Sequence, residues 1–308
     1  MLAAIVITAV ALLSAGCMGF AIQRGATCTV AAVGEIVDKG TAFRLAALLE
    51  AALWVAGGLL LARSFGLTMA LPGGVAVSGW TIAGGLLLGL GAWLNRACVF
   101  GAIARLGSGE WAYAATPLGF LVGAITVPIL FAPPVPVQLT EASMLSHLPS
   151  WLGWLLAPLV ALRLTAVIGR ADRTIWHPHE ATVVIGVTFL VLLLIAGPWA
   201  YTELLSDAAK GMVANIGFRS ALFAALLAGA WLGGWTAGSI RSRRISVSEL
   251  GRCFGGGMLM GWGSLLLPGG NDGLILVGMP LLHPYAWLGI AAMCTMIALA
   301  MRVERRWA

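Results

Sequence analysis

The chain has 308 residues, of which 60% are hydrophobic and only 10% are charged, with a formal net charge of +6. Its mean hydropathy is +0.97. A soluble domain of this size needs more charge on its surface, so the composition excludes one and predicts an all-α, polytopic membrane protein. The basic residues lie in short loops between apolar stretches, which argues against nucleic-acid binding.

About nine apolar stretches are long enough, or nearly long enough, to cross a bilayer, for which about 20 residues are needed. The third and the eighth are unusually short, as expected of half-helices or re-entrant segments. In chain order the stretches cover residues 1–22, 42–62, 80–94, 113–132, 151–168, 181–200, 217–240, 255–267 and 283–301.

Loop charge predicts the orientation of these spans. With the C-terminus in the cytoplasm, 15 of the 18 basic residues fall in cytoplasmic loops, and only Arg63, Lys210 and Arg219 fall outside. The N-terminus is then outside. No Lys or Arg precedes the first apolar run, and Ser14 stands where a lipoprotein signal prefers leucine. We therefore expect the run to be retained as a span rather than cleaved.

The sequence resembles itself at an offset of about 172 residues. The glycine-rich segment 84–92 aligns with 256–264, and Phe43-Arg44 aligns with Phe218-Arg219 at an offset of 175. Glycine-rich segments of this kind also occur where helices simply pack closely, so a packing role alone is an alternative explanation of the two segments. Corresponding spans are five apart, an odd number, so the two halves cross the membrane in opposite directions. Inverted repeats of this kind are typical of transporters, which place the substrate where the halves meet.

The chain is expected to form one membrane domain, residues 1–308. Within it we predict a first inverted repeat over 1–133, a linking span and loop over 134–180, and a second inverted repeat over 181–308.

Two short polar segments interrupt the apolar chain. Gln23-Arg24-Gly25-Ala26-Thr27-Cys28 follows the first span, and Asn95-Arg96-Ala97-Cys98 follows the third. An arginine close to a thiol at the end of a membrane helix is costly unless something uses it. At the repeat offset, Cys98 falls opposite Gly270 in the segment 268–273. There proline and glycine end the helix and leave backbone amides that suit an anion.

The cysteines and arginines of these segments also fit purely structural roles. Buried cysteines serve as packing residues, and arginines at span ends serve as anchors that reach the lipid headgroups. The five cysteines contain no Cys-x-x-Cys pair, and His177-Pro178-His179-Glu180 lacks a third ligand. We therefore expect neither a metal site nor a cofactor.

The two polar segments, with Gly101 after the second and the run from Arg252 through 255–261 to 269–273, resemble the YeeE/YedE sulfur-transport family of bacterial inner-membrane proteins. The family imports thiosulfate. The resemblance implies an hourglass-like inverted-repeat transporter, in which thiols hand a sulfur-containing anion from one constriction to the next. In an inner membrane, the outward N-terminus expected from the loop charges is periplasmic. Its expected partners are that anion, the lipid bilayer and a cytoplasmic sulfur-carrier protein.

The chain departs from the family pattern at one position. Cys28 and Cys98 match two of the three functional cysteines of the family, but Gly270 stands where the third is expected, in a Gly-Cys-Asn-x-Gly segment. A carboxylate at Asp272, beside the path, repels an anion unless it is protonated or paired with Arg252.

The predicted pathway residues are Cys28, Cys98, Gln23, Arg24, Asn95, Arg96, Gly269, Gly270 and Asn271. We expect no catalytic residue, and the phosphate-binding motif of ATPases does not occur. Three alternatives stay open. One is a membrane thiol-dependent sulfurtransferase or oxidoreductase, although neither cysteine has a base close by in sequence. The second is a transporter of a different anion, for example a selenium compound, and the third is a structural subunit.

Overall fold

The computed structural model describes residues 2–25, 27–67, 71–139, 143–169, 175–212, 215–241 and 245–307. Position 26, inside the first predicted polar segment, lies outside these ranges. Within them the chain is helical, with no strand and one isolated bridge between Val75 and Gln138. The α-helices are α1 (Leu2–Gly25), α2 (Thr29–Lys39), α3 (Phe43–Ser64), α4 (Gly79–Asn95), α5 (Val99–Gly107), α6 (Ala115–Leu130), α7 (Leu152–Ile168), α8 (Pro178–Ala196), α9 (Tyr201–Ala209), α10 (Ile216–Thr236), α11 (Val247–Leu266), α12 (Asn271–Gly273) and α13 (Pro284–Trp307). Shorter helical turns are η1 (Trp111–Ala114), η2 (Met144–His147) and the π-helical η3 (Leu274–Gly278).

The order of the elements repeats along the chain. Six of the described helices precede α7 and six follow it, and each set runs long, short, long, long, short, long. The short α2 and α9 begin at Thr29 and Tyr201, and the short α5 and α12 begin at Val99 and Asn271. Both pairs of helix starts are separated by the offset of 172 residues, which confirms the prediction of two repeats.

Glycine contacts between α4 and α11 show that the repeats are inverted. A Cβ added to Gly84 would lie 2.7 Å from the carbonyl oxygen of Gly263, and one added to Gly91 would lie 2.6 Å from that of Gly256. The start of each helix therefore lies against the end of the other, so the helices are antiparallel. The offset of 172 relates Gly84 to Gly256 and Gly91 to Gly263, so it exchanges the two contacts, as a two-fold axis in the membrane plane requires.

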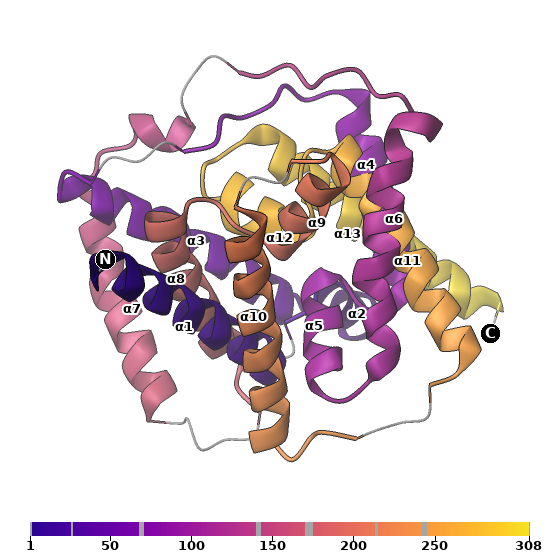
Figure 1. Cartoon of the computed structure of the whole chain (residues 1–308), viewed down its shortest axis with the longest axis horizontal. Coiled ribbons are helices and arrows are strands. Elements are labelled where there is room, and N and C mark those ends of the chain that lie inside the picture. The colour runs from indigo at the N-terminus through magenta and orange to yellow at the C-terminus, as the bar shows by residue number, and fades with distance from the viewer. Residues whose placement is uncertain are drawn as a thin grey trace.

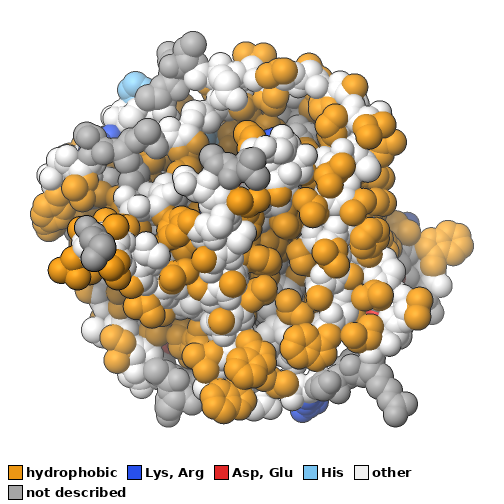
Figure 2. All heavy atoms as spheres, viewed as in Figure 1, with side chains coloured by type: hydrophobic (Ala, Val, Ile, Leu, Met, Phe, Trp, Pro, Cys, Tyr) orange, Lys and Arg blue, Asp and Glu red, His pale blue; other side chains and the backbone are white. Residues whose placement is uncertain are grey.

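Seven segments of the described chain are long and apolar enough to cross a membrane. They are Leu2–Lys39, Phe43–Ser64, Gly79–Gly107, Trp111–Leu130, Pro178–Ala196, Ile216–Thr236 and Pro284–Trp307. Figure 2 shows hydrophobic side chains over much of the visible face, with Lys and Arg confined to small patches. The chain is a multi-pass membrane protein.

The other two of the nine predicted spans also form helices. The fifth is α7, which has 17 residues and is shorter than the seven spans. The eighth is α11, which begins at Val247 rather than at 255. The first turns of α11 are polar, so hydropathy does not detect them. The helix start is instead fixed by the Ser246 hydroxyl, which accepts a hydrogen bond from the amide N–H of Glu249 (3.2 Å) and caps the helix.

Figure 1 shows the long helices in two groups. Helices α1, α3, α7, α8 and α10 form one group and α4, α6, α11 and α13 the other, with the short α2, α5, α9 and α12 between them. Glycines allow close packing within the groups, as where Gly19 of α1 lies against the backbone of Leu226 on α10. The centre of this arrangement is therefore built from the ends of short helices.

Candidate substrate pathway

Each of the four short helices follows a residue with an extended backbone. These residues are Cys28 before α2, Cys98 before α5, Ala200 before α9 and Gly270 before α12. The first amide N–H groups of a helix have no partner within it and carry partial positive charge. The hydrogen-bond donors at the starts of these helices are therefore backbone amide N–H groups rather than charged side chains.

Cys28 and Cys98 form a reciprocal arrangement, which we call the thiol pair. The amide N–H of Thr29 donates to Sγ of Cys98 (3.2 Å), and the amide N–H of Cys98 donates to Sγ of Cys28 (3.4 Å). Cys98 is fully buried and Cys28 is partly exposed. Gly101 makes room for the pair, because a Cβ added there would lie 2.6 Å from Sγ of Cys28. The structure thus brings the two predicted cysteines together.

A cavity of about 510 Å³ reaches the thiol pair, and we call it the basic vestibule. Cys28 and Gly101 lie on its wall, while Cys98 does not. The charged residues that line the vestibule are Glu35, Asp38, Lys39, Arg44, Arg96 and Arg105. An anion in this cavity would meet Cys28 first and Cys98 behind it.

The corresponding turn of the second half contains Thr202 and Asp272, which we call the carboxyl pair. The Thr202 hydroxyl donates to Oδ1 of Asp272, and the Thr202 amide N–H donates to Oδ2 (3.4 Å). The amide N–H of Gly273 also donates to Oδ1 (3.0 Å). Under the offset of 172 residues, Thr202 and Asp272 correspond to Val30 and Phe100, two positions after the two cysteines. The acceptor near this turn is therefore a carboxylate, whereas the first half uses sulfur atoms.

Two hydrogen bonds join residues next to the thiol pair to residues next to the carboxyl pair. Nδ2 of Asn271 donates to Oγ1 of Thr29 (3.4 Å), and the Tyr201 hydroxyl donates to the carbonyl oxygen of Val99 (3.0 Å). The offset of 172 relates Thr29 to Tyr201 and Val99 to Asn271, so the two bonds are repeat-equivalent. The starts of all four short helices therefore meet at one site.

Gln23 and Arg24 hold the end of α1 to its neighbours. Nε2 of Gln23 donates to the hydroxyls of Ser108 (3.3 Å) and Ser239 (3.0 Å), which follow α5 and α10. The Arg24 guanidinium donates to the Thr236 hydroxyl at the end of α10 (2.8 Å). A direct role for Gln23 and Arg24 in the pathway stays a prediction.

Asn95 and Arg96 shape the turn that leads to Cys98. Nδ2 of the fully buried Asn95 donates to the carbonyl oxygen of Ala97 (2.8 Å), and its Oδ1 accepts from the Thr116 hydroxyl (3.0 Å). Arg96 ends α4 in a left-handed conformation, with φ of 57°, and its exposed side chain lines the basic vestibule. Arg96 makes no ion pair with any described residue.

Gly269 and Gly270 form the equivalent turn of the second half. Gly269 has φ of 142°, a region that favours glycine, and its amide N–H donates to the carbonyl oxygen of Ser264 (2.8 Å). Gly270 has no space for a side chain, because a Cβ there would lie 2.7 Å from Oδ1 of Asp272 and would also overlap Thr202. The carboxyl pair fills the place of the missing third cysteine.

Arg252 is not the partner of Asp272, so of the two ways in which this carboxylate could lose its effect on an anion, pairing with Arg252 does not occur. Arg252 lies in the first turns of α11, whereas Asp272 follows the opposite end of this 20-residue helix. Together with Arg96, Arg252 lines two smaller cavities of about 150 and 330 Å³. Arg252 and Asp272 belong to the same sequence motif, but the motif does not show that most of a helix lies between them.

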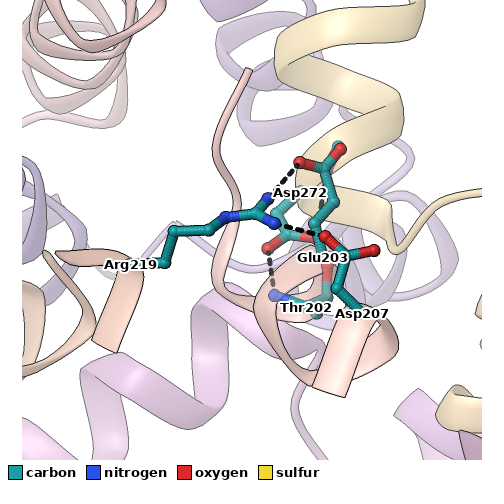
Figure 3. A network of polar contacts seen from close by, with 6 residues as sticks. Thr202, Glu203, Asp207, Arg219 and Asp272 are labelled. Atoms are coloured by element: carbon teal, nitrogen blue, oxygen red, sulfur yellow. Dashed lines mark hydrogen bonds and ion pairs between the residues drawn. The ribbon is translucent and has the colours of Figure 1, made fainter. Parts of the chain in front are cut away.

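Arg219 forms a network that the motifs do not identify. Figure 3 shows its guanidinium pointing between Glu203 and Asp207 of α9. Nη2 lies 3.8 Å from Oε2 of Glu203, and Nη1 pairs with Asp207. The repeat relates Asp207 to Glu35 and Arg219 to Arg44, which form an ion pair at 3.7 Å in the first half. Applying the offset to Glu35 would have located Asp207, whereas no sequence signal points to Thr202.

Arg219 also lines a cavity of about 230 Å³, which we call the second vestibule. Its other lining residues are Ala196, Pro198, Trp199, Asn215, Phe218 and Leu222. Since Arg44 lines the basic vestibule, repeat-related arginines line one cavity in each half.

Comparison with known proteins agrees with this geometry. The sequence model of the sulphur transport family matches the chain twice, over residues 24–173 and 162–299. The first match contains the thiol pair and the second contains the carboxyl pair. No curated protein matches the sequence. Because the two matches extend over most of the chain, this multi-pass membrane protein belongs to the sulphur transport family, the YeeE/YedE family that its motifs resemble.

Proposed function

We propose that the chain carries a small sulfur-containing anion, such as thiosulfate, across the bacterial inner membrane past Cys28 and Cys98. The thiol pair is the observation that supports this function best, because it lies at two helix starts beside the basic vestibule. Membership of the sulphur transport family supports the class of cargo.

The chemistry of the thiol pair suits a weakly bound anion. Each S–H group can donate one hydrogen bond to an oxygen or sulfur of the anion. The amide N–H groups of Thr29 and Cys98, which donate to sulfur in the structure, can turn to the anion as it passes. Partial positive charge at helix starts stabilises an anion without a fixed cation that would trap it.

The loop charges support an orientation with the basic vestibule and the C-terminus in the cytoplasm and the N-terminus in the periplasm. The second vestibule then opens to the periplasm. On this path the anion passes the carboxyl pair, then the thiol pair, and then the basic vestibule. A potential that is negative inside opposes anion uptake by about 2.3 kcal/mol per charge per 100 mV. Removal of the imported anion by a cytoplasmic sulfur-carrier protein would favour further uptake.

A transporter fits the site better than a thiol enzyme. A nucleophilic cysteine needs a base within hydrogen-bond reach. In the part of the chain that the structure describes, the groups that bond to Cys28 and Cys98 are backbone amides, the other thiol of the pair and the Thr29 side chain, and none is a histidine or a carboxylate.

Uptake by purified protein in liposomes tests the proposal. We expect saturable uptake of radiolabelled thiosulfate, with sulfite, selenite and sulfate as competitors that rank the selectivity. No uptake of any of the four anions would contradict a transport function. A persulfide on Cys28 or Cys98, detected by mass spectrometry without measurable flux, would support the enzyme instead.

A further inference from the structure

We propose that Asp272 carries a proton that crosses the membrane together with the anion, its carboxylic acid acting where other members of the family have a thiol. The inference rests on the proposed transport function and adds the coupling ion to it. It concerns the carboxyl pair of the second half and not the thiol pair.

The Asp272 side chain takes the place of the missing thiol. Its Oδ1 lies 2.7 Å from the position of a Cβ on Gly270, the residue that stands for the third cysteine. The carboxyl group therefore occupies the space in which that thiol would lie. A neutral carboxylic acid has one O–H donor, as a thiol has one S–H donor, whereas a carboxylate has none.

The surroundings of Asp272 favour a neutral side chain. The residue is 2% exposed, and this burial is what favours the neutral form. The hydrogen bonds that its oxygens accept from the Thr202 hydroxyl and from the amides of Thr202 and Gly273 act in the opposite direction. No ion pair in the described residues includes Asp272, since Arg219 is bound by Glu203 and Asp207. A buried carboxylate without a counter-ion is costly, and taking up a proton removes the charge.

The charged and titratable groups around Asp272 include one cation, Arg219, and it is bound by other carboxylates. Helix α9 contributes Tyr201, Glu203 and Asp207, α10 contributes Arg219, and α5 contributes Cys98. Helix α13 contributes Tyr285, which faces Glu203, and η3 is entirely apolar. With every carboxyl group ionised, three carboxylates face one guanidinium. Three carboxylates and one guanidinium give a net charge of −2, and protonation of Asp272 reduces it to −1, so an anion that approaches from the second vestibule is repelled less.

A neighbouring atom indicates that a donor is absent from the site. Oδ1 of Asn271, next to Asp272, is buried and has no hydrogen-bond partner in the described residues. Leaving such an acceptor unpaired is costly, so the site favours the arrival of an O–H donor, as water or as a protonated carboxyl group.

The proposed cycle moves one proton and breaks no other bond. A proton from water in the second vestibule binds an Asp272 oxygen, and the resulting acid donates its hydrogen bond to the anion. When the anion moves on to the thiol pair, the proton leaves Asp272 toward the basic vestibule. One proton therefore enters with each anion.

Liposomes that contain the purified protein test this coupling, with the membrane potential clamped at zero. A pH gradient of one unit, alkaline inside, should raise the steady-state accumulation of thiosulfate about tenfold, because one unit corresponds to a tenfold proton ratio. A pH-sensitive dye inside the vesicles should report proton inflow when thiosulfate is added.

Two variants separate titration from structure. Asp272→Asn keeps the size of the side chain and a hydrogen-bond donor, so exchange of labelled for unlabelled thiosulfate should continue. Its accumulation should no longer respond to the pH gradient. Asp207→Asn, at a carboxylate bound to Arg219, is the matched control and should keep the response.

Infrared spectroscopy gives a readout that does not depend on flux. The wild type at neutral pH should show a protonated carboxyl C=O band that Asp272→Asn lacks and that shifts when thiosulfate is added. Absence of this band with and without thiosulfate overturns the inference, as does uptake by the wild type that ignores the pH gradient. Absence of any anion uptake, in contrast, overturns the proposed function.

Discussion

The thiol pair and the carboxyl pair lie in equivalent turns but join their helix starts with different chemistry. In the first half, sulfur atoms accept the amide N–H groups of Thr29 and Cys98. In the second, the carboxylate of Asp272 accepts the amide and hydroxyl of Thr202. A thiol has one S–H donor, whereas an ionised carboxylate has no donor and gains one only when it takes up a proton. The two repeats therefore share the arrangement of the helix starts, while the side chains at these starts set a different charge in each half.

Replacing Cys98 with alanine should have the largest effect on transport. The change removes an S–H donor at a fully buried position whose repeat partner, Gly270, has no side chain to replace it. A hydrogen bond to a charged group contributes about 1.5–3 kcal/mol, so we expect uptake to fall about tenfold to a hundredfold. The measurement is the initial rate of thiosulfate uptake in liposomes.

The control for this variant is Cys253→Ala, because Cys253 is equally buried but lies on α11 and is not a member of the thiol pair. Its uptake rate should stay close to that of the wild type. Equal losses in the two variants would show that burial of a thiol matters and that its place in the pair does not.

Restoring the third cysteine by Gly270→Cys should damage the protein rather than improve it. The new side chain overlaps Thr202 and Asp272, and overpacking of this kind costs about 1–3 kcal/mol. Thermal unfolding followed by tryptophan fluorescence should show a lower melting temperature. Gly251→Cys, where an added Cβ meets nothing within 4 Å, should not. A Gly270→Cys variant with full stability and faster uptake would mean that the carboxyl pair does not fill this place.

The two hydrogen bonds across the centre allow a direct comparison of the halves. Tyr201→Phe removes the bond to Val99, and Thr29→Val removes the bond from Asn271. Each should lower the free energy of unfolding by about 0.5–1.5 kcal/mol, and the two costs should be similar because the bonds are repeat-equivalent. Denaturant titration in detergent measures both. A large cost for one variant alone would show that one half carries the stability of the centre.

Much of the fold could be predicted from the sequence because hydropathy and repetition are local signals. The apolar stretch predicted at 80–94 forms α4 over Gly79–Asn95, and the glycine segment 84–92 does lie against its repeat partner 256–264. The start of α11 escapes prediction because its first turns are polar. The two cysteines stand out in the sequence because each follows a helix end and has a polar neighbour.

The chemistry of the second half could not be predicted in the same way. The space beside Gly270 is filled by Thr202, which is distant in sequence and belongs to no motif, so only the folded chain shows that a cysteine does not fit. Charge alone favours a pairing of Asp272 with Arg252. That pairing does not form because most of the length of α11 separates the two residues.

The repeat-equivalent ion pairs Arg44–Glu35 and Arg219–Asp207 should give the smallest effects. Exposed pairs contribute little, and the Arg44 side chain is 42% exposed against 21% for Arg219. Glu35→Gln should therefore leave the melting temperature unchanged, while Asp207→Asn should cost up to about 1 kcal/mol. The second value stays small because Glu203 continues to hold Arg219 after the change. A larger loss in Glu35→Gln, measured in the same salt, would mean that the basic vestibule depends on its carboxylates for stability and that the halves differ there as well.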